Sequence, residues 1–189
     1  LNSSDKNVLN ILWVGKMDFR KQLGLALGSL AYTKNTNIQL HIVGGGDTTY
    51  YRNLAISLGV KERCKWYGAI SHEKVQKIMQ ESDLFFFTSV SEGTPHVVLE
   101  AIDNYLPVLC FDTCGQGDVV NEQVGIKIPL SNPKQSVKDF ARKIECLYAH
   151  RELLAQFSQN CRQRQMELSW DIKAKQMVAL YQSAMVRKL

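Results

Sequence analysis

Two acidic and three basic side chains in this sequence could act together on a phosphate-bearing molecule. Glu92 and Glu100 are eight residues apart, and Lys16, Arg20 and Lys21 occur in an earlier segment. Cations placed in this way can neutralise the negative charge that develops on a diphosphate leaving group. The spacing alone also fits a plainer interpretation, in which the cations are solvated surface charges and Glu100 is an ordinary helix residue.

A helix is predicted to follow Glu92, beginning at Pro95 and ending at Asn104. Proline suits the first helical position, because the N–H that it lacks has no helical partner there. The N-terminus of such a helix presents unpaired N–H groups and a partial positive charge, which suit phosphate or sugar oxygens. Glu100 would lie in the second turn, on the side that can face the ends of the strands.

Short apolar runs alternate with segments of helical periodicity over the first two thirds of the chain. Several runs are apolar almost throughout, as in parallel strands that are covered on both faces. We expect strands at Val8–Val14, Ile38–Val43, Cys64–Tyr67, Leu84–Thr88, Pro107–Phe111 and Ile126–Ile128. We expect helices at Lys21–Tyr32, Tyr50–Leu58, Ser71–Gln80 and Pro95–Asn104. This order predicts an α/β fold with a doubly wound, mostly parallel, Rossmann-like sheet.

The last third of the chain has a different pattern, without a predicted strand. A first helix carries Val137, Phe140 and Ile144 on one face, and two more are expected at Glu152–Gln165 and Asp171–Arg187. We therefore expect a single domain, with its strand and helix core at about residues 8–130 and a helical tail at about residues 134–189. The tail could cover this domain or reach across to a part of the protein outside this sequence.

The loops that follow the predicted strands form the candidate site, since ligands of open α/β sheets bind beyond the carboxyl ends of the strands. These loops are rich in glycine, small polar residues and cations. Gly44–Gly46 could contact a ligand or serve only as a flexible turn. The triplet is not a dinucleotide-binding fingerprint, because it follows the second strand and Thr49 stands where a small residue is required; a Walker A loop is also absent.

Composition limits the remaining possibilities. With 189 residues, 45% hydrophobic and 22% charged, the chain is ordinary globular material rather than a disordered or fibrous one. No apolar run approaches the ~18 residues of a membrane helix, and no block of like charge is long enough to bind nucleic acid. The net charge of +5 fits an anionic ligand or an acidic membrane surface, or carries no functional meaning.

The cysteine pattern indicates a reduced protein without a zinc site. The five cysteines lack the spacing of a disulfide framework or of a zinc site, so we expect partly buried thiols of a cytoplasmic protein.

The first residues have neither a signal-peptide pattern nor an initiator Met, so we expect that residue 1 is a cut in a longer chain.

The loop sequences resemble, in order, the motifs of a known enzyme family. The segment from Ser91 to Ala101 resembles the E-x7-E signature of retaining GT-B glycosyltransferases of family 4, called glycosyl transferases group 1. Other segments similar to family motifs are Val14–Lys21, Ile42–Gly46, Trp66–Gly68 with Ser71 and His72, Ser82–Ser89, and Ser169 with Trp170. The resemblance covers nearly the whole chain and implies the C-terminal, donor-binding domain of such an enzyme.

The resemblance implies a role for each matching residue. Lys16 and Lys21 would hold the diphosphate and stabilise it as it leaves, with Arg20 also at the donor. Glu92 would contact the donor sugar near the reacting centre, and Glu100 would hydrogen-bond the ribose hydroxyls. The other donor-binding positions would be Gly15, Gly93, Thr94, Pro95, His96 and Val97, with Gly68, Ala69 and Ile70 at the base.

Several positions depart from the family pattern or stay ambiguous. Lys16 stands where Arg is usual, which keeps the charge but loses the bidentate fork. Gln22 replaces a usual Gly, and Asp118 is shorter than the usual Glu. Because of these departures, the sequence does not identify the class of donor. His96 could contact the sugar or be an ordinary polar helix residue.

The resemblance implies metal-independent transfer of a hexose from a UDP- or GDP-sugar to a glycan or lipid-linked acceptor, with retention of anomeric configuration. An N-terminal acceptor domain is absent from this chain. We therefore expect the chain to bind nucleotide without transferring sugar. The expected setting is bacterial cell-surface polysaccharide synthesis, of lipopolysaccharide or capsule, in the cytoplasm and in reach of the inner membrane face. The alternatives are a non-catalytic doubly wound nucleotide-binding module and a GT-B nucleotide-sugar epimerase, which the E-x7-E pair disfavours.

Overall fold

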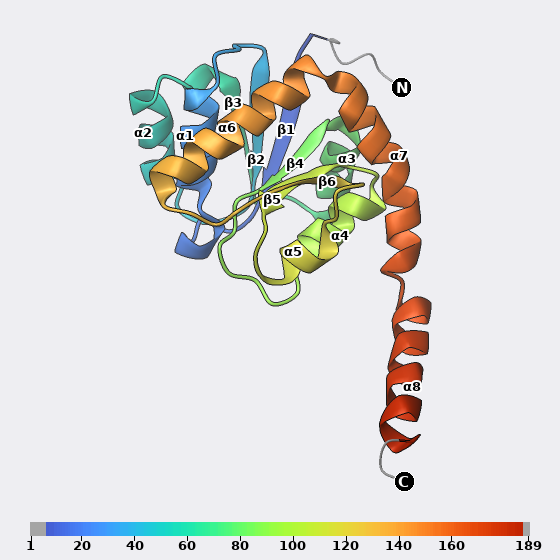
Figure 1. The fold of residues 1–189 in the computed structure, drawn as a ribbon. Coiled ribbons are helices and arrows are strands. Elements are labelled where there is room, and N and C mark those ends of the chain that lie inside the picture. Colours follow the sequence, from blue (N-terminus) through green and yellow to red (C-terminus); the bar gives the residue numbers. More distant parts are fainter. Residues whose placement is uncertain (1–6, 187–189) are drawn as a thin grey trace.

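One parallel sheet forms the centre of the molecule (Figure 1). The computed structural model describes residues 7–186; the N-terminal segment and Arg187, the end of the last predicted helix, lie outside the described residues. Within that range the strands are β1 (Leu9–Val14), β2 (Ile38–Val43), β3 (Cys64–Gly68), β4 (Leu84–Phe87), β5 (Val108–Phe111) and β6 (Gly125–Ile128). Neighbouring strands are all parallel, in the order β3-β2-β1-β4-β5-β6. The predicted Rossmann-like fold class is confirmed.

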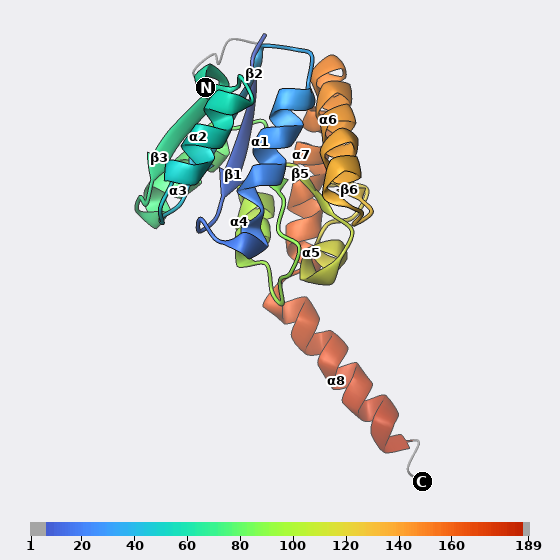
Figure 2. The same ribbon diagram turned by 90° about the vertical axis from the view of Figure 1, so that its left-hand side faces the viewer.

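Helices cover both faces of this sheet (Figures 1 and 2). They are α1 (Leu23–Tyr32), α2 (Thr49–Ser57), α3 (His72–Glu81), α4 (His96–Asp103), α5 (Cys114–Val119), α6 (Pro133–Ala149), α7 (Arg151–Glu167) and α8 (Trp170–Val186), with short 3-10 helices η1 (Phe19–Lys21) and η2 (Lys61–Arg63). One core cluster joins one face of the sheet to α1, α2 and α6, and a second joins the other face to α3 and α4. Helix α7 contributes to both clusters, through Leu154 and Cys161.

Aromatic side chains hold the middle of the sheet. Phe85, Phe86 and Phe87 of β4 are buried, as expected from the apolar run. Phe140 of α6 packs edge-on against Phe86 and Phe111, with ring centroids 4.8 Å and 4.7 Å apart. Such aromatic pairs add stability beyond the area that they bury. Helix α6 is therefore part of the core that carries the sheet.

Most predicted element boundaries differ from the structure by one or two residues, and one short helix was not predicted. Helix α1 begins at Leu23, because Gln22 has a left-handed backbone (φ 52°) that no right-handed helix contains. Helix α4 begins at His96, one residue after Pro95, which is its N-cap. Residues 114–119 form the short helix α5 where a loop was expected, since their two glycines are poor helix formers. At the sheet edge, β3 is half-buried or exposed rather than covered on both faces.

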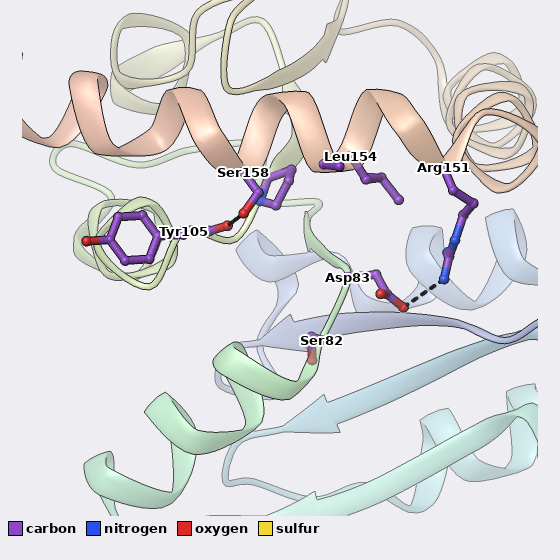
Figure 3. A pocket seen from close by; sticks show the side chains of 8 residues that line it. Ser82, Asp83, Tyr105, Arg151, Leu154 and Ser158 are labelled. Carbon is purple, nitrogen blue, oxygen red and sulfur yellow. Dashed lines mark hydrogen bonds and ion pairs between the residues drawn. The ribbon is translucent and has the colours of Figure 1, made fainter. Parts of the chain in front are cut away.

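Polar contacts fasten α7 to the amino ends of the central strands (Figure 3). Arg151 pairs with the Asp83 carboxylate at 3.3 Å, and that carboxylate also accepts a hydrogen bond from the backbone N–H of Asn10 at 2.7 Å. Ser158 donates to the Tyr105 carbonyl at 2.7 Å. Asp83, Tyr105, Arg151 and Ser158 are among the residues that line a cavity of about 250 Å³. Asp83 precedes β4, so this cavity lies at the amino ends of the strands, opposite the loops that follow the strands.

Helix α8 extends away from the domain (Figures 1 and 2). It leaves at the end of the molecule where the loops after β1 and β4 lie. Its side chains from Lys173 to Met185 are all exposed, including the apolar Met177, Leu180 and Tyr181. In the described part of the chain, no helix combines the length and the apolar character that crossing a membrane requires.

Candidate functional site

The loops after β1 and β4 meet where the strand order reverses. The chain runs outward from β1 through β2 to β3 and then returns to β4 on the other side of β1. Ligands of open α/β sheets bind at such a switch point, beyond the carboxyl ends of the strands. Lys21 comes from the loop after β1 and Glu92 from the loop after β4, so the two loops bring a cation and a carboxylate to this point.

Lys21 and Glu92 form an ion pair in which both side chains are mostly buried. The Lys21 ammonium bonds to Oε1 of Glu92, and the side chains are 16% and 12% exposed. Ser89 donates to the same Oε1 at 2.7 Å. Burial of Glu92 by itself would raise the pKa of this carboxyl, but the hydrogen bonds from Lys21 and Ser89, with the charges of Lys21 and Arg20, outweigh burial and lower the pKa below 4.5. Glu92 is therefore ionised at neutral pH.

The cationic loop has a defined backbone. Asp18 caps η1 by accepting a hydrogen bond from the Lys21 N–H at 3.2 Å. Arg20 is exposed, with its guanidinium 3.5 Å from the Asp18 carboxylate. Lys16 is exposed in the same loop. The three predicted cations thus share one loop, but only Lys21 reaches Glu92.

Glycines let the loops after β1 and β2 pass each other closely. A Cβ on Gly44, where φ is 146°, would lie 1.7 Å from the Gly15 carbonyl oxygen. A Cβ on Gly15 would lie 3.0 Å from the Trp13 ring and 3.2 Å from Lys21 Cγ. At Gly46, with φ 122°, it would lie 2.9 Å from Met17 Cβ. Gly44 and Gly46 therefore have a packing role as a turn, whether or not a ligand also contacts them.

Residues 93–95 lead into α4, and residues 96–100 form its first five positions, beside α5. Gly93 and Thr94 are exposed, Pro95 is buried as the N-cap, and His96 is exposed at the first helical position. The N–H of Gly115 donates to the Glu92 carbonyl at 3.3 Å, so α5 holds the start of this loop. Val97 and Glu100 are half-buried in α4, with Glu100 on its second turn as predicted.

The loop after β3 lies on the far side of β1 and β2 from Glu92. Gly68 and Ala69 are exposed, and Ile70 is half-buried in the second core cluster. The carbonyl of Gly68 accepts a hydrogen bond from the Gly44 N–H at 2.9 Å. The predicted base-binding loop therefore reaches the site through the glycine turn after β2, without a direct bond to Lys21 or Glu92 in the described residues.

Four residues that support the site have no role predicted from the sequence, although Ser89 ends the Ser82–Ser89 motif. Thr88 and Ser89 follow β4, Trp13 lies in β1, and Gln116 lies in α5; all four side chains are buried. A signal for the first two exists in the sequence, since two hydroxyl residues directly follow the wholly apolar Leu84–Phe87. Trp13 and Gln116 carry no such signal.

The thiols and possible metal ligands give a mixed result. Cys110 and Cys161 are buried and Cys64 is half-buried, but Cys114 and Cys146 are exposed, which corrects the expectation that all five are partly buried. All five are free. Among residues 7–186, no three His, Cys, Asp or Glu side chains are grouped so that they could hold a metal ion.

Known proteins share this sequence pattern and this fold. An uncharacterized glycosyltransferase of Methanocaldococcus jannaschii is 27% identical, over 94% of this chain and 51% of its own length. The structure of WaaG, a glycosyltransferase involved in lipopolysaccharide biosynthesis, superposes with a TM-score of 0.75 at 23% identity, over 88% of this chain and 44% of WaaG. The pneumococcal O-GlcNAc transferase GtfA, solved with UDP and GlcNAc, gives 0.76 at 20% identity, over 92% of this chain and 35% of GtfA.

The chain spans about half, or less, of the length of the curated relatives that it matches. The sequence model described as "Glycosyl transferases group 1" matches residues 2–164, which is most of the chain. Together with the parallel sheet and the loop motifs, this match shows that the chain belongs to the glycosyl transferases group 1 family, with the fold of a GT-B C-terminal domain.

Proposed function

We propose that this domain binds a nucleotide-sugar donor and that the whole enzyme transfers the sugar, with retention, to a glycan or lipid-linked acceptor. The observation that carries the proposal is the ion pair of Lys21 and Glu92 at the strand-order reversal. The UDP and sugar named with the GtfA structure support a nucleotide-sugar as the ligand class. The lipopolysaccharide role of WaaG supports cell-surface polysaccharide synthesis as the setting.

Lys21 has the hydrogen-bonding capacity to serve Glu92 and a diphosphate together. An ammonium carries three N–H donors, and Glu92 takes one of them. The remaining donors, with the exposed Arg20 and Lys16 in the same loop, can neutralise the charge that collects on the diphosphate oxygen as its bond to the sugar breaks. This role needs no metal ion.

Glu92 and Glu100 divide between the two ends of the donor in this proposal. Glu92 is ionised and held by Lys21 and Ser89, so it can accept a hydrogen bond from a donor-sugar hydroxyl near the reacting carbon. Glu100, half-buried in α4, would accept hydrogen bonds from the ribose hydroxyls. Residues 93–97 would supply N–H groups to the sugar or phosphate oxygens, and Gly68–Ile70 would meet the base.

Calorimetry with UDP, GDP and ADP tests the donor-binding proposal on this chain. At least one nucleotide should bind, and Lys21→Met should weaken that diphosphate more than it weakens the corresponding monophosphate. Lys143→Met is the matched control, because Lys143 is exposed on α6 and should leave affinity unchanged. If none of the three nucleotides binds at millimolar concentration, the proposal is wrong.

The acceptor side of the reaction is tested separately. We propose that an N-terminal domain binds the acceptor, so this chain alone should bind nucleotide without transferring sugar. Restoring the full-length gene product should produce transfer in the presence of donor and acceptor. An epimerase would instead convert the nucleotide-sugar without any acceptor, which the same assay detects.

A further inference from the structure

Two buried hydroxyls at the end of β4 join both halves of the candidate site. Thr88 and Ser89 are 0% and 1% exposed. The Thr88 hydroxyl lies 2.8 Å from the Lys21 carbonyl and 3.1 Å from the Gln22 carbonyl. The Ser89 hydroxyl lies 2.7 Å from the Glu92 carboxylate. Adjacent residues of one strand end thus touch the backbone of the cation and the side chain of the acid.

The hydrogen bond from Trp13 determines the direction in which the Thr88 hydroxyl donates its own proton. The Trp13 Nε1–H lies 3.0 Å from the Thr88 oxygen, and an indole nitrogen can only donate. Thr88 therefore accepts from Trp13 and keeps its own proton for the carbonyls of Lys21 and Gln22. This arrangement fixes the backbone at Lys21 directly before the left-handed residue Gln22.

Ser89 has one proton and two acceptors within reach. Its hydroxyl lies 2.7 Å from Glu92 Oε1 and 3.1 Å from the Arg20 carbonyl. The Arg20 carbonyl already accepts from the Val90 N–H at 3.0 Å, and a bond to a carboxylate is the stronger of the two. The proton therefore goes to Glu92.

Gln116 fixes Ser89 from the other side. The fully buried Gln116 donates to the Ser89 carbonyl at 3.1 Å. Ser89 is therefore held at its backbone by α5, while its hydroxyl bonds to Glu92. An alanine would fill most of the same space, so the bond to Glu92 is the main interaction that the hydroxyl adds.

We propose that Thr88 and Ser89 are positioning residues of the donor site, Thr88 through the backbone of Lys21 and Ser89 through the carboxylate of Glu92. Together they hold the acid and the cation in one relative geometry before a ligand arrives. The binding consequences rest on the proposed function, whereas the hydrogen bond from Ser89 to Glu92 can be tested without any ligand.

The ligand-free test follows the Glu92 carboxyl by NMR, with carbon-13 at glutamate Cδ. Ser89→Ala should move the Glu92 titration to higher pH, because a hydrogen bond to the charged form is lost. Ser89→Thr keeps a hydroxyl and should restore the wild-type titration. Ser29→Ala is the matched control, since Ser29 is equally buried but donates to the Leu25 carbonyl within α1.

An unchanged Glu92 titration in Ser89→Ala would overturn the role of Ser89. If Ser89→Ala does not fold, Ser89→Cys replaces it, because a thiol is a weaker donor and should give a shift in the same direction. These outcomes do not depend on nucleotide binding. Failure of the wild-type chain to bind UDP or GDP would count against the proposed function alone.

The binding test separates the two hydroxyls by ligand. Thr88→Val should weaken UDP or GDP roughly three- to tenfold, the loss expected for about one hydrogen bond, with a smaller effect on UMP or GMP. Ser89→Ala should weaken UDP-glucose or GDP-mannose more than the free diphosphate. Equal losses for diphosphate and monophosphate in Thr88→Val would reduce Thr88 to a structural residue and overturn its positioning role.

Discussion

Lys21 and Glu92 are 71 residues apart in sequence and form an ion pair across the point where the strand order reverses. The Lys21 ammonium also lies 5.2 Å from the centre of the Phe87 ring, at the end of β4. Because water reaches little of either side chain, removing one partner leaves the other as a poorly solvated charge. The pair therefore links the stability of the two loops to the donor binding that we propose for them.

Glu92→Gln keeps the shape of the side chain and removes its charge. We expect it to lower the free energy of unfolding by about 1–3 kcal/mol, less than for a fully buried pair because some solvent reaches both groups. Urea denaturation at neutral pH measures this change. Asp139→Asn, which breaks the more exposed Arg142–Asp139 pair, is the control and should cost at most about 1 kcal/mol. An equally small cost for Glu92→Gln would contradict a stabilising ion pair.

The contribution of Glu92 to stability should depend on pH. Its folded pKa is lowered, so the contribution is fully present above the ordinary value of 4.5 and is lost as pH falls through the folded pKa. The difference in unfolding free energy between wild type and Glu92→Gln should stay constant above about pH 5.5 and shrink below pH 4.5. Urea denaturation in steps from pH 6 to pH 3 tests this; a difference that grows on acidification would have the wrong sign.

The sequence predicted what periodicity and loop order control. The alternation of apolar runs placed β1 and β4 and, through the switch-point rule, the loops that hold Lys21 and Glu92. It could not show that these two side chains bond, because their contact depends on how the strands are ordered in space. The hydrogen bonds of Trp13 and Gln116 were hidden for the same reason, since each joins elements that are remote along the chain.

Gln22 shows why a departure from a motif has a structural cost. It occupies the left-handed region, φ 52° and ψ 46°, at the position where the motif resemblance implies a glycine. Gln22→Gly should raise the free energy of unfolding by about 0.5–1 kcal/mol, because a Cβ is unfavourable there. Gln22→Ala keeps the Cβ and loses the bond to the Phe19 carbonyl, so it should not stabilise. Thermal denaturation compares the two, and equal melting temperatures would refute the backbone explanation.

Gly44 should tolerate no side chain. Gly44→Ala would place a Cβ 1.7 Å from the Gly15 carbonyl oxygen, so the loop after β1 must move. We expect a lower melting temperature and weaker nucleotide binding, since the displaced loop carries Lys21. Gly24→Ala is the control, because Gly24 lies in α1 and an added Cβ would meet only the Leu54 side chain, at 3.7 Å. It should raise the free energy of unfolding by up to about 1 kcal/mol. Unchanged stability and binding in Gly44→Ala would show that the loops do not pass this closely.

Phe140 tests which part of the helical tail belongs to the fold. Phe140→Ala removes an α6 ring that packs on Phe86 and Phe111, and should lower the free energy of unfolding by about 3–5 kcal/mol. Tyr181→Ala in α8 is the matched control, because that side chain is 63% exposed and should change stability by less than about 0.5 kcal/mol. Urea denaturation of both variants decides the point. If Tyr181→Ala costs as much as Phe140→Ala, α8 must pack on the domain in solution, contrary to its exposed position here.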